Sequence, residues 1–216
     1  MKKISTLFTG LAVIGLALFS NQKAAAQKEA GQSVVTLGVG ESLVGSIFSV
    51  ASSSTSGGSY SISHSPAILG MYDYGLSDRF SIGAAFSYQS FSTAYTNYSY
   101  YNSTTGGAYY GSWTDKITRI NYAVRALFHF GDNENFDPYF GLRLGFTNWS
   151  ASTTNPDPNY ATDNGFGVTI KGAIAPQVVF GVRYFFTPLI GVNLEAAIGS
   201  PYYASAGVNF KFGGSK

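Results

Sequence analysis

Charged side chains recur at alternate positions within otherwise apolar stretches, and they are the residues of this sequence best placed to do chemistry. Along residues 119–130, Arg119 and Arg125 alternate with Ile120, Val124 and Phe130. Because successive side chains of a strand point to opposite faces, the charges gather on one face, which we take as the inside of a closed sheet. The predicted interior charge network consists of Asp73, Arg119, Arg125, Arg143, Arg183, Glu195 and Lys211, with Lys171 as a further member.

Two kinds of chemistry fit such a network. A lone buried charge costs several kcal/mol, so charges inside a closed sheet must pair or be hydrated. One interpretation is a salt-bridged plug in which Arg125, Arg143 and Arg183 surround Asp73 and Glu195. The excess of basic residues keeps a second interpretation open, a narrow cation-lined path for an anion or another small solute.

A tyrosine-rich segment over residues 95–113 is the second candidate site. Tyrosine rings stack on sugars and their hydroxyls form hydrogen bonds, which suits surface recognition. The alternative, which we favour, is that these residues continue two strands as a protruding hairpin with an aromatic girdle. The residues of this possible binding loop are Tyr98, Tyr100, Tyr101, Tyr109, Tyr110 and Trp113.

Catalysis is not expected. His64 lies between Ser63 and Ser65, but adjacent strand residues point to opposite faces, so His64 cannot easily act as the base for either serine. No acid obviously accompanies His64, and His129 lies toward the far end of its strand. The sequence also has no phosphate loop and no paired His or Cys with metal-ligand spacing. We therefore expect a protein that is not an enzyme and that uses no cofactor or metal.

Eight strands are predicted from the alternation of apolar with polar or small residues. The C-terminal strand is a clear example, because Val208, Phe210 and Phe212 point one way while Tyr203 and Lys211 point the other. A Ser/Gly-rich loop with an apolar patch is expected over 41–63, an irregular region over 91–113, a turn over 131–137 and a loop over 153–164. The predicted strands are 34–40, 66–74, one starting at 80, 120–130, 140–147, 178–186, 190–198 and 203–212.

The connections between these strands alternate in length. They are short after the second, fourth and sixth strands and long after the first, third and fifth; only the connection near residues 199–201 breaks the pattern. Short turns at one end and long loops at the other are typical of outer-membrane barrels. The sequence therefore predicts an all-β fold, an eight-stranded antiparallel up-and-down transmembrane barrel. A soluble β-sandwich is the alternative for the same alternation.

The N-terminus and the composition agree with an exported membrane barrel. Lys2 and Lys3, an uncharged apolar run and a small-residue site at residues 24–26 are typical of a secretory signal peptide. We expect residues 1–26 to be that signal and residues 27–216 to be the barrel domain. Charged residues make up 11% of the chain and aromatic residues 16%, whereas soluble domains carry about a quarter charged residues. There is no cysteine, hence no disulfide, and no basic stripe for nucleic acid.

Four segments together resemble the small eight-stranded outer-membrane β-barrel family of the OmpA/OmpX/OmpW type. They are residues 74–83, 136–142, 181–188 and 208–212. The resemblance implies a porin-like barrel in the cell envelope of a Gram-negative bacterium, with a structural or surface-interaction role and a largely closed, charge-lined lumen. It leaves open a narrow channel for small solutes or hydrophobic molecules and, less favoured, a lipid-modifying barrel enzyme. The implied partners are outer-membrane lipid, lipopolysaccharide and the barrel-insertion machinery, and the implied state is a monomer.

Overall fold

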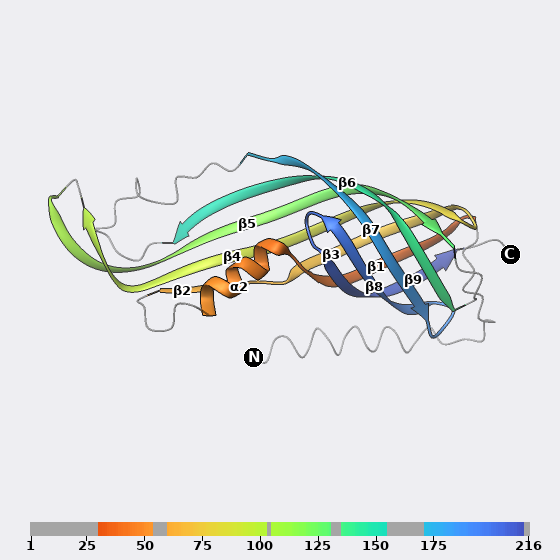
Figure 1. Ribbon diagram of the computed structural model, residues 1–216, viewed down its shortest axis with the longest axis horizontal. Helices are drawn as coiled ribbons and strands as arrows, with labels where there is room; N and C mark the ends of the chain where they lie inside the picture. Colours follow the sequence, from red (N-terminus) through yellow and green to blue (C-terminus); the bar gives the residue numbers. More distant parts are fainter. Residues whose placement is uncertain (1–29, 54–59, 103–104, 131–134, 155–170, 214–216) are drawn as a thin grey trace.

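The protein is built almost entirely from antiparallel strands (Figure 1). The computed structural model describes residues 30–53, 60–102, 105–130, 135–154 and 171–213. The expected signal peptide and the last three residues lie outside this range. The strands are β1 (Gln32–Glu41), β2 (Tyr60–His64), β3 (Ala67–Ser77), β4 (Phe80–Asn102), β5 (Gly107–His129), β6 (Phe136–Thr154), β7 (Ala173–Phe185), β8 (Ile190–Gly199) and β9 (Ala204–Gly213).

The sheet closes on itself as an eight-stranded barrel. Each of β3 to β8 pairs with the strand that follows it, and β1 completes the circle because Leu37 is paired with both Gly70 of β3 and Val208 of β9. The short β2 continues β3 along the same edge of β4, and the Ser65 amide donates to the Ser90 carbonyl at 2.8 Å between them. Pro66, which has no N–H to donate, interrupts the ladder there. Thus β2 and β3 fill one position, and the predicted fold class is confirmed.

The two ends of the barrel differ in form. At one end, called the turn end, lie the β3–β4, β5–β6 and β7–β8 connections, the start of β1 and the end of β9. At the other, called the hairpin end, β4 and β5 run far beyond the closed part of the barrel (Figure 1). Pairing of these two strands continues to Asn102 and Gly107. The predicted alternation of short and long connections is therefore observed, but two of the long connections expected as loops are instead a helix and an extended hairpin.

The expectation of an irregular region over 91–113 is wrong. The described residues of this region extend the β4–β5 hairpin, as the favoured alternative predicted. The register shifts between Tyr95 and Tyr98, where Asn97 has a φ of 50°. Tyrosine and threonine fit the pleated surface of a strand, so their abundance favours the hairpin over a loop.

A helix, α2 (Leu43–Ser53), replaces the first half of the loop expected over 41–63. Ser42 caps it, since its Oγ accepts the Gly45 amide at 3.0 Å. Leu43, Ile47 and Val50 recur at helical spacing, but the Ser- and Gly-rich composition concealed this signal. Among the described residues no helix is long and apolar enough to cross a membrane.

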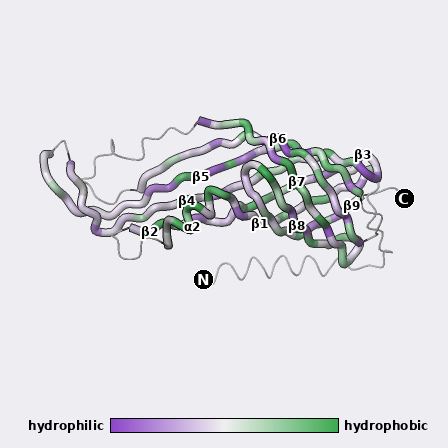
Figure 2. The backbone as a smooth tube through the Cα atoms, in the orientation of Figure 1, coloured by the Kyte–Doolittle hydropathy of each residue, from purple (hydrophilic) through white to green (hydrophobic). Residues whose placement is uncertain are grey.

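The barrel has its polar residues inside and its apolar residues outside. In β9, Asn209 and Lys211 are buried while Val208 and Phe212 are exposed, as the alternation predicted. In Figure 2 hydrophobic (green) and hydrophilic (purple) residues alternate along the strands of the closed part, whereas the protruding hairpin is paler. The interior of an eight-stranded barrel is just wide enough for side chains to fill. The charged residues are therefore forced close together.

Candidate functional site

Arg125 is the centre of the ion-pair cluster in the lumen, the space enclosed by the closed part of the barrel. It projects inward from β5, and its Nη2 donates to Glu195 Oε2 of β8 at 2.8 Å. Its Nε lies 3.1 Å from Asp73 Oδ1 of β3, an ionic contact without hydrogen-bond geometry. The three side chains have no solvent exposure. Arg125 thus joins opposite walls of the barrel.

Arg183 of β7 extends this cluster toward the turn end. Its Nη2 donates to Asp73 Oδ2, and its Nη1 lies 3.6 Å from Asp137 Oδ2 of β6. Asp73 therefore bridges the two arginines. Arg183 also lies over the ring of Tyr139, 4.8 Å from its centroid, in a cation–π contact.

Glu195 is held by hydroxyl groups as well as by Arg125. The Tyr139 hydroxyl donates to Glu195 Oε2 at 2.8 Å, and the Tyr202 hydroxyl donates to Oε1. Both tyrosines are buried. Each oxygen of this carboxylate thus has a donor, which a buried charge requires.

The remaining predicted lumen residues, Arg119, Arg143 and Lys211, are buried as well. Arg143 donates from Nη2 to Asn121 at 2.7 Å and packs over the Tyr202 ring, and no described carboxylate lies within 4.0 Å of it. Lys211 Nζ lies 4.2 Å from the Phe185 ring centroid. Arg119 lies near the hairpin end. Arg143 therefore contacts amides rather than the acids expected of a plug.

Two expectations for inward-pointing residues are wrong. Lys171 is exposed, because it precedes the first residue of β7 rather than lying within the strand. Tyr203 is exposed and contacts Ser46 at 3.2 Å, while Tyr202 takes the inward position. The strand β9 begins only at Ala204, so the alternation extrapolated back to Tyr203 does not hold across the β8–β9 connection.

A second polar group, absent from the sequence-based network, lies near the turn end. His129 Nδ1 is 2.6 Å from Asp137 Oδ1, and His129 Nε2 is 2.9 Å from Ser81 Oγ. This is the order of groups in a serine-hydrolase triad. Ser81, however, has no solvent exposure, so a substrate carbonyl cannot reach its hydroxyl. The group instead fastens β4, β5 and β6 to one another.

His64 contacts neither of its neighbouring serine hydroxyls, as expected from strand geometry. Its Nε2 lies 2.7 Å from Ser49 Oγ of α2, and its Nδ1 lies 3.0 Å from the Ser65 carbonyl oxygen. These contacts fix α2 to β2. Within the described residues no group of three potential metal ligands could hold an ion.

Arg119 is the buried arginine of the lumen that lies nearest the hairpin end of β5. Its guanidinium contacts the rings of both Phe91 and Trp149, 5.9 and 5.5 Å from their centroids, and the two rings stack on each other at 6.2 Å. Its Nη2 donates to Gln89 Oε1 and to the Pro201 carbonyl. Beside it, a hollow of about 450 Å³ opens between α2, β6, β7 and the β8–β9 connection.

The protruding hairpin carries an aromatic cluster. Trp113 is buried against Tyr95, stacked at 4.5 Å, and Tyr98, which is edge-on at 5.7 Å between ring centroids. Trp113 Nε1 also donates to Asp115 at 3.3 Å. Burial raises the pKa of the Tyr95 hydroxyl, and the Asp115 carboxylate raises it further. Trp113 therefore packs within the hairpin rather than facing solvent.

The other residues of the proposed binding loop lie near the hairpin tip. Tyr101 and Tyr110 are among the most exposed aromatic residues of the described chain, while Tyr109 is half-buried. Tyr100 is paired with Tyr109 in the ladder. Residues 103 and 104 lie outside the described range. The loop thus presents tyrosine rings at its tip and packs them at its base.

Comparison with known proteins identifies the family. The model of the outer membrane protein beta-barrel domain matches residues 11–213. The chain belongs to this family. No curated protein matches the sequence.

Solved structures share the barrel with little sequence identity. OprG from Pseudomonas aeruginosa is similar with a TM-score of 0.51 at 10% identity, over 87% of this chain and 99% of that chain. The N-terminal β-barrel domain of Pseudomonas aeruginosa OprF has a TM-score of 0.43 at 14% identity, over 86% and 100%. Ail, the attachment invasion locus protein of Yersinia pestis, has a TM-score of 0.44 at 11% identity, over 85% and 99%. The likeness to OprG shows the fold alone.

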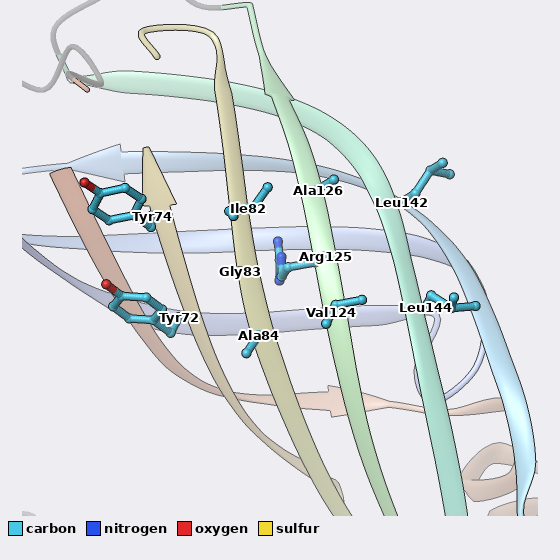
Figure 3. Close-up of a pocket in the computed structure, with 10 residues that line it drawn as sticks. All are labelled: Tyr72, Tyr74, Ile82, Gly83, Ala84, Val124, Arg125, Ala126, Leu142 and Leu144. Carbon is cyan, nitrogen blue, oxygen red and sulfur yellow. The ribbon is translucent and has the colours of Figure 1, made fainter. Parts of the chain in front are cut away.

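Because the chain belongs to this family, its outward apolar face contacts the hydrocarbon of the outer membrane. This face is uneven where small residues replace large ones. A hollow of about 580 Å³ crosses β3 to β6, with Ala84 and Ala126 as its low floor between taller tyrosine and leucine side chains (Figure 3). Its lining is Tyr72, Tyr74, Ile82, Gly83, Ala84, Val124, Arg125, Ala126, Leu142 and Leu144. Apolar lining at such a face is what lipid contact requires.

Proposed function

We propose that this barrel serves as a membrane-anchored scaffold with a closed lumen, and that it presents the β4–β5 hairpin at the cell surface. The observation that carries the proposal is the Arg125 cluster. Its ion pairs join β3, β5 and β8 across the lumen, and the side chains involved have no solvent exposure. A continuous water-filled path through this level would require those pairs to separate.

The direction of the barrel follows from its unequal ends. The hairpin end carries the long connections and the exposed tyrosines, and outer-membrane barrels place their long loops outside and their short turns in the periplasm. Both chain termini then lie on the periplasmic side, as export through a signal peptide over residues 1–26 requires. The apolar band contacts lipid and lipopolysaccharide, and the barrel acts as a monomer placed by the insertion machinery.

A structural or surface-interaction role fits this arrangement better than catalysis. The Ser81–His129–Asp137 group is buried, and the contacts of His64 hold α2 in place. The exposed Tyr101 and Tyr110 rings supply amphipathic contact area with little side-chain entropy to lose, which suits recognition.

Conductance tests the closed lumen. Mature protein, shown to be folded by its heat-shifted mobility on a denaturing gel, is inserted into planar bilayers. We expect no discrete ion steps from the folded barrel. Anion-favouring steps would refute the closed lumen and make Arg119, Arg125, Arg143 and Arg183 the candidates for a selectivity filter.

The second candidate function is a narrow channel for small solutes or hydrophobic molecules. It is favoured by Arg143, which has no described carboxylate within ion-pair distance and adds positive charge to the lumen. Replacing Arg143 with Gln would abolish anion selectivity in such a channel. In a closed barrel the same variant remains silent.

A further inference from the structure

Arg119 is a buried cation without a counter-charge. Its side chain is 3% exposed, and both of its hydrogen-bond acceptors, the Gln89 amide oxygen and the Pro201 carbonyl, are neutral. Within the described residues no carboxylate lies within 4.0 Å of its guanidinium. Both hydrogen bonds come from Nη2, so Nη1 and Nε remain free to donate to a ligand. An uncompensated buried charge is costly and is rarely retained without a partner.

The hollow beside Arg119 is lined mainly by apolar groups. Val44 of α2, Trp149 of β6 and Ile174, Ala175 and Pro176 of β7 form much of its wall. Its volume of about 450 Å³ falls within the range of small-molecule sites. One cation among apolar walls matches a ligand with one anionic group and a hydrocarbon body.

The hollow exists because β7 and β8 end nearer the turn end of the barrel than β6 does. Thr147 of β6 pairs with Ala173, the first residue of β7, whereas β6 itself continues to Thr154. The β7–β8 pairing in turn begins only at Gln177, opposite Gly199. Residues 173–176 therefore lie between β6, which extends farther toward the hairpin end, and β8, which ends earlier. Their side chains line the hollow.

An apolar stripe leads away from the hollow along α2. Leu43 lines the hollow, and Leu43, Ile47 and Val50 lie on one helix face by their spacing. Their side chains are 67%, 66% and 69% exposed, although α2 is held to the rest of the barrel through Ser46 and Ser49. A hydrocarbon chain longer than the hollow would find this stripe at its exit.

We propose that the hollow binds a single-chain anionic amphiphile, such as a long-chain carboxylate, whose head is held by Arg119 and whose chain contacts Trp149 and the apolar wall. The site requires no open path through the lumen, so it goes beyond the scaffold role and can fail or succeed independently of conductance. Contacts with the Phe91 and Trp149 rings and the two hydrogen bonds from Nη2 hold the guanidinium in place, so the cation is positioned before the ligand arrives.

Tryptophan quenching provides a direct test. The chain has two tryptophans, and Trp149 lines the hollow while Trp113 lies in the hairpin. A Trp113→Phe protein in zwitterionic lipid nanodiscs is titrated with 11-bromoundecanoate, whose bromine quenches a nearby indole. We expect saturable quenching with the carboxylate and at least about tenfold weaker binding of 11-bromoundecanol, because the alcohol cannot form a charge-assisted hydrogen bond.

Two variants in the Trp113→Phe background separate the head from the chain. Arg119→Gln should weaken carboxylate binding at least about tenfold and leave alcohol binding unchanged. Ala175→Leu, which fills the hollow without replacing Arg119, should weaken both ligands and decides the matter if Arg119→Gln does not fold. Arg79→Gln, an exposed position at the turn end, is the matched control and should bind normally.

The proposal is refuted if carboxylate and alcohol bind equally, because quenching would then report only partition into lipid. Normal binding by a folded Ala175→Leu protein would also refute it. Inorganic phosphate that displaces the carboxylate at equal concentration would show a simple anion site instead. A barrel that conducts in planar bilayers but passes these tests would overturn the closed lumen and leave this site standing.

Discussion

Replacement of Arg125 by Met tests whether the central ion pairs hold the barrel together. Met has a similar length but no charge, so Asp73 and Glu195 each lose one cationic partner. Removing one partner of a buried ion pair typically costs about 3–5 kcal/mol. Asp73 keeps Arg183, and Glu195 keeps the hydroxyl of Tyr139. We therefore expect the lower end, about 3 kcal/mol, or roughly a hundredfold in the folding equilibrium.

The assay is equilibrium unfolding in urea of protein folded into lipid vesicles, followed by the heat-shifted mobility on a gel. Arg79→Met at the exposed turn end is the matched control and should lie within about 0.5 kcal/mol of the unmodified protein. Adding Glu195→Gln to Arg125→Met should recover part of the loss, because it removes the buried carboxylate that Arg125→Met leaves without a cationic partner. A loss below about 1 kcal/mol for Arg125→Met, or simple additivity in the double variant, would refute the plug.

Three further predictions concern other levels of the protein. Gly181→Ala should destabilise the barrel by about 1–3 kcal/mol in the same assay, since the new Cβ would lie 2.3 Å from the Tyr139 ring. Gly70→Ala, whose new Cβ would have no atom within 4 Å, is the control and should be nearly neutral. Equal destabilisation by the two substitutions would contradict this packing. Trp113→Ala should speed hydrogen exchange in the protruding hairpin and spare the closed barrel, and slowed or unchanged exchange would show that the aromatic cluster does not stiffen it. Burial raises the pKa of the Tyr95 hydroxyl above 10.0, so the contribution of this residue to hairpin stability is complete below pH 10.0 and is lost as the pH rises further. Protection of the hairpin from hydrogen exchange that stays constant through alkaline pH would oppose this.

The faces of the strands could be predicted because alternation is a local property. Each residue of a strand points opposite to its neighbour, so Arg119 and Arg125 of one strand had to share the face that excludes Val124. Few charges overall and aromatics on the apolar face then indicated that this face meets lipid. Both steps need only the sequence and the period of two.

The ends of the strands were harder to predict because composition and periodicity conflicted there. Residues 91–113 contain the Ser, Thr and Gly of a loop, yet cross-strand pairing extends to Asn102 and Gly107. Leu43, Ile47 and Val50 carry helical spacing within a segment whose composition favours a loop. In both places the element forms because residues distant in the sequence contact it: β4 and β5 pair with each other, and other parts of the barrel hold α2. A short stretch of sequence carries no information on such contacts.

The sequence by itself determined which residues share a face of each strand, so that the charges lie on one face and the apolar residues on the other. Only the tertiary structure decided which charges meet, because strand tilt and stagger set which side chains share a level of the lumen. It pairs Arg125 with Asp73 and Glu195, and it leaves Arg143 to amides. It also turns Tyr202 rather than Tyr203 inward, since the β8–β9 connection resets the alternation before Ala204.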